Sequence, residues 1–313
     1  MLSRIRKLRE AGVVGINARN HSYVMPNNPR RMYKYVDDKV LTKQLAEKAN
    51  IAVPRLYGLI TTIHDSDSIT KIIGDKKDFV IKPAHGSGGK GILVIENRRK
   101  DLFIKPNGTA ISNKLVKHHV ENILGGVYSL GGQPDQAIIE YRVKFDPVFD
   151  SISYQGVPDI RMLIYKGIPA MAMLRLPTQQ SDGKANLHQG AVGVGIHLTT
   201  GITTLAVCKD RRIAEHPDFG SKLSDIQIPG WQNLLLLSAR CYELAPLGYL
   251  GVDIVLDAEL GPLMLELNAR PGLAIQIANG RGLQHRLDAI DNITALPSNA
   301  EERIEIVKLI SEH

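Results

Sequence analysis

The sequence has few cysteines and no long apolar run. Its 313 residues include two cysteines, Cys208 and Cys241, which lie far apart and have no second cysteine or histidine at ligand spacing. This excludes a disulfide framework or a cysteine-based zinc site and predicts two reduced thiols. No apolar run approaches the ~20 residues that cross a bilayer, and residues 1–15 are too charged for a secretory signal. We therefore expect a cytoplasmic protein without a transmembrane segment.

Most of the chain carries no excess of positive or negative charge. The net charge is +7, and residues 1–36 account for all of it, since they hold eight lysines or arginines against a single acid, Glu10. A basic arm can meet nucleic acid, an anionic membrane surface or an acidic partner. The alternative is a solvated, partly helical arm that packs against the body of the protein, and the sequence leaves both open.

The rest of the sequence predicts an α+β fold with antiparallel sheets. With 43% hydrophobic and 23% charged residues, the chain is typical of a globular protein whose length allows two domains. Residues 36–54 predict a helix of about ten residues that is capped by Asp37 or Asp38. Residues 78–98 predict two strands joined by a glycine-rich loop. Further patterns predict strands within 136–143, 160–177 and 251–268, and helices within 111–124, 231–248 and 298–313, the last with a capping box of Ser298 and Glu301.

Polar side chains interrupt the apolar segment LMLELNARPG, residues 263–272. Because alternate residues of a strand share a face, Glu266 and Asn268 are expected to point the same way, about 7 Å apart. Asp253 lies in the preceding strand, which folds back against this one. Two carboxylates and an amide oxygen suit Mg²⁺ or Mn²⁺ bound together with phosphate. The alternative is a polar row on the solvent face of a one-sided sheet. The opposite face of the strand is expected to carry Leu263, Leu265 and Leu267.

The loop KPAHGSGGKGI suits the binding of phosphate. Its small residues let backbone N–H groups close over phosphates, and Lys90 adds positive charge. It lacks the P-loop pattern and the strand-to-helix context of a dinucleotide fingerprint, so a flexible hairpin tip explains it equally well. Lys82, among apolar neighbours in the preceding strand, requires a counter-charge or solvent, and phosphate is a suitable partner. The small residues are Gly86, Ser87, Gly88, Gly89 and Gly91.

Taken together, six segments resemble the ATP-grasp ligases in order and spacing, across residues 12 to about 290. The resemblance is greatest to the ribosomal-protein glutamate ligase branch and, within it, to the α-L-glutamate ligase-like proteins, of which GINARN and NPRRMYKYVDDK are also typical. The segments are DDKVLTKQLAEKANIAVP, FVIKPAHGSGGKGI, IIEYRV, PDIRMLIYKGIPAMAMLR, KANLHQG and GVDIVLDAELGPLMLELNARPGL.

The resemblance implies an ATP-grasp fold, in which two α+β subdomains with antiparallel sheets sandwich ATP. Residues 1–36 would form a basic arm in place of the usual preceding domain. Residues 37–135 would form the N-terminal subdomain with the glycine flap, and residues 136–313 the C-terminal subdomain with the hinge and the metal site.

The resemblance also implies roles for individual residues. The loop 86–91 would cover the ATP phosphates, the backbone of the hinge would pair with adenine, and arginines would point at the transferring phosphate and the acyl phosphate. Phosphate contacts would come from Lys39, Lys82 and Lys90, the hinge from Glu140 and Tyr141, a contact near the ribose from Asp159, and further nucleotide contacts from Lys184. The catalytic residues would be Arg161, Arg175 and Asn186, and the ligands of two metal ions would be Asp253, Glu266 and Asn268.

The implied activity is that of an ATP- and Mg²⁺-dependent carboxylate–amine ligase. An acceptor carboxylate would form an acyl phosphate, which an amine then converts to an amide, adding glutamate or a similar amino acid to a peptide or small amine. The implied partners are these substrates, an anionic partner for the basic arm and a second copy of the chain. Two alternatives remain open, a nucleotide-binding scaffold that has lost ligation and an ATP-grasp kinase.

Several features depart from the family pattern. The segment ahead of Lys39 is too short for a domain, and the link DAELGP between the carboxylate strands is one residue longer than expected. Arg270 stands where related ligases often have a small residue, and it either binds an anionic substrate group or braces the loop. Among His85, His188 and His197, His188 is the most interesting candidate for a phosphate or substrate contact, with a structural role as the alternative.

Overall fold

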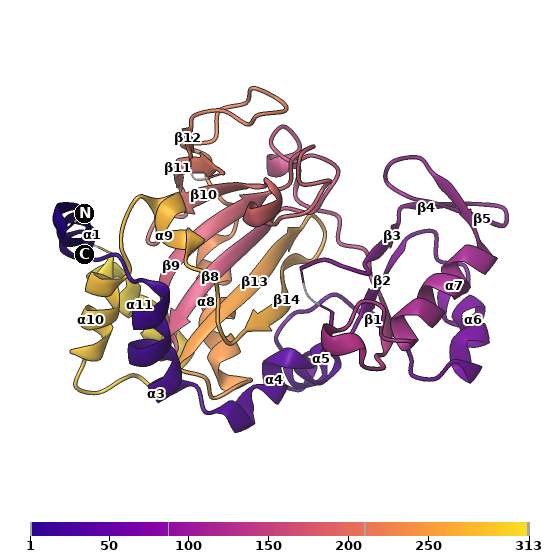
Figure 1. Cartoon of the computed structure of the whole chain (residues 1–313), viewed down its shortest axis with the longest axis horizontal. Coiled ribbons are helices and arrows are strands. Elements are labelled where there is room, and N and C mark those ends of the chain that lie inside the picture. Colours follow the sequence, from indigo (N-terminus) through magenta and orange to yellow (C-terminus); the bar gives the residue numbers. More distant parts are fainter. Residues whose placement is uncertain (1, 87, 210, 312–313) are drawn as a thin grey trace. The chain divides into compact units, whose positions relative to one another are not determined.

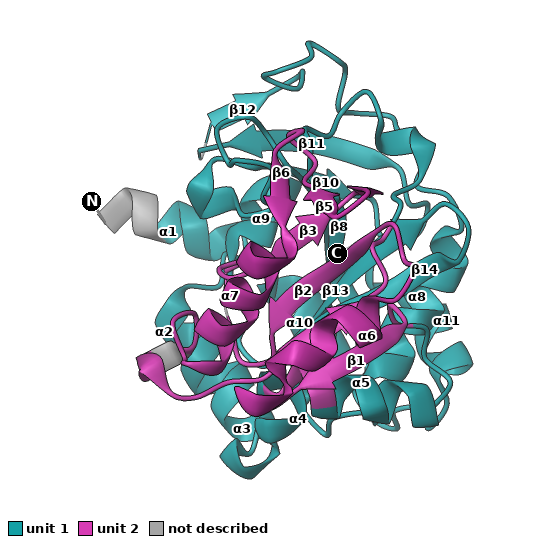
Figure 2. Ribbon diagram, turned by 90° about the vertical axis from the view of Figure 1, so that its right-hand side faces the viewer, with its two compact units in different colours: residues 1–37, 41–52, 144–313 teal, residues 38–40, 53–143 magenta. Residues whose placement is uncertain are grey.

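In the computed structural model, residues 2–86, 88–209 and 211–311 are described, and they form helices and antiparallel sheets. The chain divides into two compact units (Figure 2). Unit 1 comprises residues 1–37, 41–52 and 144–313, and unit 2 comprises residues 38–40 and 53–143. The predicted α+β class is therefore confirmed. Within the described ranges, no helix is both long enough and apolar enough to span a bilayer.

Unit 1 is built on a seven-stranded antiparallel sheet with the order β12-β11-β10-β9-β8-β13-β14 (Figure 1). The turn between β8 and β9 has two residues, Lys166 and Gly167, with φ angles of 49° and 83°. Positive φ at both positions matches the right-handed twist of a two-residue hairpin, as the sequence predicted. The strands are β8 (Asp159–Tyr165), β9 (Ile168–Leu176), β10 (Val192–Ile196), β11 (Thr203–Cys208), β12 (Arg211–Ile213), β13 (Tyr249–Asp257) and β14 (Gly261–Asn268).

The centre of this sheet is buried. Every residue of β8 and β13 is buried, and helices pack against the sheet. This explains why these strands are apolar on both faces except at a few charged positions. The helices are α8 (Trp231–Arg240), α9 (Ala274–Asn279), α10 (Gln284–Asp291) and α11 (Ala300–Ile310). Both Cys208 and Cys241 are free cysteines.

A β-bulge changes the faces of β14. Asp257 to Ile254 pair with Gly261 to Met264, but Asp253 pairs with Glu266, so Leu265 is the extra residue. Directly paired residues share a face. Leu263, which pairs with Val255, therefore lies on the face of Glu266, and the prediction that Leu263, Leu265 and Leu267 line one face is wrong. The bulge places Glu266 directly opposite Asp253.

The cap of the last helix also differs from the prediction. The side chain of Asn299, not Ser298, accepts a hydrogen bond from the backbone N–H of Glu302 at 2.7 Å. Asn is as good an N-cap as Ser, and it stands one residue closer to the apolar stripe. The helix therefore begins at Ala300, and the proposed capping box of Ser298 and Glu301 is wrong.

The basic N-terminal segment packs on unit 1. Asn28, which is 3% exposed, donates from its amide to the carbonyls of Tyr249 (2.7 Å) and Ala269 (2.8 Å) and accepts from the N–H of Tyr249 (2.9 Å). The buried Arg19 donates to the carbonyl of Pro271 at 3.0 Å. These bonds favour the packed arm over the free arm. Its helices are α1 (Leu2–Glu10), α2 (Ile16–Ala18), α3 (Met25–Asn27) and α4 (Lys34–Asp37), with a π-helical turn at Arg19–Val24 and a 3₁₀ turn at Arg30–Met32.

The predicted helix after this arm is present as α5 (Lys39–Lys48). The carboxylate of Asp38 accepts a hydrogen bond from the N–H of Val40 at 2.9 Å, which is the contact expected of a capping residue at this end of the helix.

Unit 2 contains a four-stranded antiparallel sheet, in the order β1-β7-β2-β3, and a small three-stranded sheet, β4-β5-β6. Phe79 and Phe103 meet edge to face in its core, with ring centroids 5.4 Å apart. The predicted hairpin around the glycine loop is present as β2 and β3. The elements are β1 (Leu56–Ile60), α6 (Ile69–Ile73), β2 (Phe79–Pro83), β3 (Leu93–Ile95), β4 (Asn97–Arg99), β5 (Leu102–Ile104), β6 (Ala110–Ser112), α7 (Asn113–Leu124) and β7 (Ala137–Glu140).

Candidate functional site

Four strands of unit 1 bring charged side chains onto one face of the sheet. Asp253 on β13 pairs with Arg161 on β8 and with Glu266 on β14. One alternation further along, Asp159 on β8 pairs with Arg175 on β9. Because directly opposite residues and alternate residues share a face, these five side chains converge. We call them, together with Asn268, the carboxylate–arginine cluster.

Each arginine of the cluster holds a carboxylate. Arg161 donates to both oxygens of Asp253, with Nε–Oδ1 at 2.6 Å and Nη2–Oδ2 at 2.5 Å. Arg175 donates from Nε and Nη2 to both oxygens of Asp159, and its Nη2 is also 2.8 Å from Oδ2 of Asp253. Asp253 is only 2% exposed. Two guanidinium groups balance two carboxylates, as buried charges require.

The two aspartates of the cluster differ in acidity. Burial raises the pKa of Asp159 to about 6, against the opposing effect of Arg175. Burial acts in the same direction on Asp253, but there Arg161 and Arg175 together outweigh it and hold its pKa well below the usual range. Asp253 therefore carries a full negative charge at neutral pH, which two guanidinium groups compensate.

The donor chemistry of the cluster fits a magnesium ion. Asp253 and Glu266 are cross-strand neighbours, and Nδ2 of Asn268 is 3.4 Å from Oδ2 of Asp253. Two carboxylates and an amide are hard oxygen donors of the kind that Mg²⁺ prefers. No group of three or more His, Cys, Asp or Glu side chains suited to a metal occurs among the described residues. The set depends on the amide oxygen of Asn268 as its third donor.

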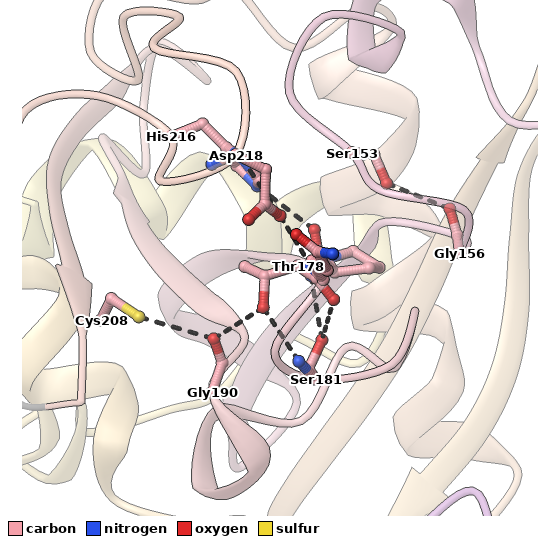
Figure 3. Close-up of polar contacts among 10 residues, drawn as sticks. Ser153, Gly156, Thr178, Ser181, Gly190, Cys208, His216 and Asp218 are labelled. Atoms are coloured by element: carbon pink, nitrogen blue, oxygen red, sulfur yellow. Dashed lines mark hydrogen bonds and ion pairs between the residues drawn. The ribbon is translucent and has the colours of Figure 1, made fainter.

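The loop between β9 and β10 is held by a buried turn (Figure 3). The N–H of Thr178 donates to Oγ of Ser181 at 2.9 Å, and the N–H of Ser181 donates to Oγ1 of Thr178 at 3.0 Å. Oγ1 of Thr178 donates in turn to the carbonyl of Gly190 at 3.0 Å. These contacts tie the start of the loop to its end, so the segment that carries Lys184 and Asn186 is closed on itself.

A buried histidine fixes the same loop from outside. Nε2 of His216 donates to the carbonyl of Pro177 at 3.2 Å, while its Nδ1 accepts from the N–H of Asp218 at 3.3 Å (Figure 3). The carboxylate of Asp218 accepts from the N–H of Gln179 at 2.7 Å. Burial lowers the pKa of His216, so the ring is neutral and its single proton lies on Nε2.

Within this loop, the predicted contact residues point to different partners. The Asn186 side chain accepts from the N–H of His188 at 3.0 Å and caps a 3₁₀ turn, Leu187–Gln189. Nζ of Lys184 is 3.8 Å from Oδ2 of Asp182.

A pocket of about 240 Å³ lies beside the 3₁₀ turn. It is lined by Leu187, His188, Val207, Lys209, Ala274 and Ile277.

In unit 2, the glycine loop is anchored at both ends. Nζ of Lys39 donates to the carbonyl of Gly86 at 2.8 Å, and Nε2 of His119 is 2.9 Å from the carbonyl of Gly91. A Cβ at Gly91 would lie 2.5 Å from the ring of Tyr128, whereas a Cβ at Gly88 would meet open space. The ends of the loop are therefore fixed and its tip is not crowded. Ser87 lies outside the described residues.

The counter-charge that Lys82 requires is supplied by the protein. Its Nζ is 2.5 Å from Oε1 of Glu140 on the neighbouring strand β7, and both side chains are nearly buried. The N–H of Tyr141, the second predicted hinge residue, donates to the carbonyl of Arg55 at 2.9 Å. Lys82 thus does not need phosphate for neutrality, and the adenine contact of the hinge stays a prediction.

Arg270 lies against the N-terminal arm. Its guanidinium is 5.2 Å from the centroid of the Tyr33 ring, a cation–π contact. This favours the bracing role over binding of a substrate anion. Sequence patterns did not indicate Asn28, Asp135 or His216 as supports of the candidate site. Each of the three has a partner on a distant segment, namely Tyr249, His85 and Pro177, respectively.

Comparison with known proteins identifies similar chains. Residues 18–292 match the model of a family described as sugar-transfer associated ATP-grasp. A probable alpha-L-glutamate ligase of Aeromonas salmonicida (strain A449) is 22% identical over 256 residues, which cover 80% of this chain and 62% of that protein. This chain thus spans less than two thirds of the length of that relative.

Two solved structures are similar at low sequence identity. The ATP-grasp ligase PsnB, complexed with a minimal precursor, is 15% identical with a TM-score of 0.45, over 85% of this chain and 63% of that chain. The D-cycloserine synthetase DcsG is 14% identical with a TM-score of 0.44, over 91% of this chain and 72% of that chain.

Proposed function

Because the chain belongs to the sugar-transfer associated ATP-grasp family, we propose that it is an ATP- and Mg²⁺-dependent ligase that joins a carboxylate to an amine. Membership places it among the ATP-grasp proteins, which use ATP and magnesium. The geometry of the carboxylate–arginine cluster supports the proposed roles of its residues.

One observation carries the proposal most directly. Arg161, Arg175 and Asp253 meet on one buried face of a rigid sheet, with Arg175 reaching both Asp159 and Asp253. A protein seldom buries four formal charges without a use for them, since apolar residues of similar volume are often as stable. Preorganised guanidinium groups are suited to stabilise negative charge that develops during phosphoryl transfer.

The reaction would proceed in two steps. A carboxylate oxygen of the first substrate attacks the γ-phosphorus of ATP, the bond to the β-phosphate oxygen breaks, and ADP leaves. The amine nitrogen of the second substrate then attacks the acyl carbon, phosphate leaves, and the nitrogen loses a proton to give the amide. Arg161 and Arg175 would bind the transferring phosphoryl group, and Asn186 would contact it from the loop between β9 and β10.

Asp253, Glu266 and Asn268 would hold the metal. Bound there, Mg²⁺ supplies charge neutralisation at the phosphate oxygens, and we expect two ions. For Asp253 to bind the cation, Arg161 and Arg175 would exchange part of their contacts with Asp253 for contacts with phosphate.

The residues of unit 2 would bind the nucleotide. Lys39, Lys82 and the glycine loop with Lys90 would contact the phosphates, and Glu140 and Tyr141 would form the hinge. From unit 1, Asp159 and Lys184 would make further nucleotide contacts. An acyl phosphate hydrolyses in water, so a loop that covers it would protect the intermediate.

We propose an amino acid, glutamate or a similar one, as one substrate and a peptide or a small amine as the other. The relative named as a probable alpha-L-glutamate ligase supports this choice of amino acid. We further propose that exposed basic residues of the N-terminal arm bind an anionic partner. We also propose that the chain associates with a second copy of itself.

The test is ADP release from ATP and Mg²⁺ over a panel of amino acids and short peptides, with mass spectrometry of the products. The parent protein should yield ADP, phosphate and an amide. Asp253→Asn should lower turnover by about 100-fold or more, because one of the proposed metal ligands loses its charge. The matched control is Asp225→Asn, an exposed carboxylate paired with Lys222, which should retain full turnover.

The products separate the alternatives. ADP with a phosphorylated product and no amide would show a kinase. Binding of ATP without turnover on any substrate of the panel would favour a scaffold. Full turnover by Asp253→Asn would refute the metal assignment itself.

A further inference from the structure

His85, directly before the glycine loop, forms a hydrogen-bonded pair with Asp135. Nδ1 of His85 is 2.8 Å from Oδ1 of Asp135. The backbone N–H of His85 also donates to Asp135, at 3.1 Å and 3.0 Å from its two oxygens, and the N–H of Gln136 donates to Oδ1 at 2.7 Å. The Asp135 side chain is fully buried, whereas that of His85 is 45% exposed.

These contacts fix the tautomer of His85. A carboxylate that already accepts two backbone N–H groups acts as an acceptor, so Nδ1 of the ring carries the proton that it donates to Asp135. Nε2, on the other side of the ring, has no protein partner among the residues that the structure describes. Carboxylate–histidine pairs use this arrangement to aim the second nitrogen of the ring at a ligand.

Support of the Asp135 carboxylate alone does not explain why residue 85 carries an imidazole side chain. The backbone N–H groups of His85 and Gln136 already satisfy the buried carboxylate of Asp135, so its hydrogen bonding does not require the ring. The His85 side chain is 45% exposed to solvent. Ordering this ring at the surface costs conformational entropy, which a ligand of Nε2 would offset.

The surroundings of His85 suit an anion. The next residue, Gly86, accepts from the ammonium of Lys39, and Lys90 follows in the same loop. Gly88 and Gly89 have φ angles of 63° and 75°, the conformation in which backbone N–H groups of a glycine loop can turn toward a phosphate. The carboxylate of Asp135, which contacts the ring, accepts from the backbone N–H groups of His85 and Gln136 as well as from the ring.

We propose that His85 is a phosphate-binding residue, whose Nε2–H donates to a terminal phosphate oxygen of the nucleotide while Nδ1–H donates to Asp135. The proposal rests on the proposed function only in taking ATP as the nucleotide. Each nitrogen of the ring then donates to an anion in a charge-assisted hydrogen bond. Asp135 acts through the ring and is a positioning residue.

One substitution separates phosphate binding from bracing. In His85→Asn, the shorter amide can still donate to Asp135 from the position of Nδ1, but no group remains at the position of Nε2. In His85→Gln, the longer amide can place a neutral donor near Nε2. The matched control is His118→Asn, a histidine on α7 of the same unit whose side chain is 66% exposed.

The experiment is calorimetric titration of the full chain and its variants with the nonhydrolysable analogue AMPPNP with Mg²⁺, and with adenosine, after thermal unfolding has shown that each variant is folded. We expect His85→Asn to weaken AMPPNP binding about tenfold and to leave adenosine within twofold, because only the phosphates meet Nε2. His85→Gln should recover part of the loss, and His118→Asn should bind as the parent does.

Three results would overturn the assignment. An unchanged AMPPNP affinity in His85→Asn would mean that the ring only braces the loop. An equal loss for adenosine would mean a general disturbance of the unit. A parent chain that binds no AMPPNP would overturn nucleotide use together with the role of His85. Binding is measured without turnover, so a failed search for an amide product does not affect this test.

Discussion

The guanidinium of Arg161 donates hydrogen bonds to both carboxylate oxygens of Asp253 on the neighbouring strand. The two residues are 92 positions apart in the chain, and the pairing of β8 with β13 puts them side by side. Because Asp253 is buried, its charge depends on this partner and on Arg175. The pair therefore contributes to folding as well as to any chemistry at the site.

Removal of the Arg161 guanidinium should lower the free energy of unfolding. Arg161→Met leaves the buried Asp253 with Arg175 as its remaining cation, and we expect a loss of about 3 kcal/mol in the free energy of unfolding. Urea unfolding measures it. Arg6→Met, which removes an exposed helical ion pair with Glu10, is the control and should change stability far less. A loss in Arg161→Met no larger than in the control would contradict the dependence of Asp253 on Arg161.

The N-terminal arm should behave as part of unit 1 rather than as a tail. Asn28→Ala leaves the carbonyls of Tyr249 and Ala269 and the N–H of Tyr249 without their partner, so unfolding should become easier by roughly 2–4 kcal/mol. Chemical denaturation gives the value. Asn107→Ala, at an exposed turn, should cost under about 0.5 kcal/mol. Equal stability of the two variants would show that the arm is not anchored through Asn28.

Two glycines of the same loop should respond differently to alanine. Both Gly88 and Gly91 have positive φ, so alanine strains the backbone at each by about 1 kcal/mol. At Gly91 the new methyl group would in addition lie 2.5 Å from the Tyr128 ring, which forces the loop or the ring to move. We expect Gly91→Ala to lower the melting temperature clearly more than Gly88→Ala. A reversed order would contradict the described anchoring of the loop end.

Much of this arrangement follows from local patterns, and the remainder depends on contacts between distant segments. The alternation around Glu266 and Asn268 and the fold-back from Asp253 predicted that these three residues lie close together. In the structure Asp253 pairs directly with Glu266, and Nδ2 of Asn268 is 3.4 Å from Oδ2 of Asp253. The bulge at Leu265 was not predicted, because a single extra residue leaves no mark on an apolar strand. The adenine, phosphate and metal contacts remain predictions.

The partners of buried charges were harder to anticipate. Lys82 in an apolar strand indicated a counter-charge, but its identity as Glu140 depends on the pairing of β2 with β7. The role of Asn28 depends on carbonyls more than 200 positions away, and nothing in its own neighbourhood specifies them. Sequence patterns therefore indicated where polar groups are needed, while tertiary pairing decided which groups satisfy each other.

The stability of the protein should depend on pH through His216. Burial lowers the pKa of this histidine in the folded state, so its contribution is fully present above its unfolded pKa of about 6.5 and is lost as the pH falls below that value. Asp159 acts in the opposite direction. Because its pKa is raised to about 6, its protonation favours the folded state as the pH falls from about 6 toward 4.

A comparison of variants isolates the histidine. His216→Gln can keep a donor to the carbonyl of Pro177 without a titrating group, so its free energy of unfolding should fall less between pH 7.5 and pH 5.5 than that of the parent. The difference cannot exceed about 1.4 kcal/mol per pH unit for one proton. Urea unfolding at both pH values measures it, with the exposed His64→Gln as the control. Parallel losses in parent and His216→Gln would show that the buried ring does not titrate with folding.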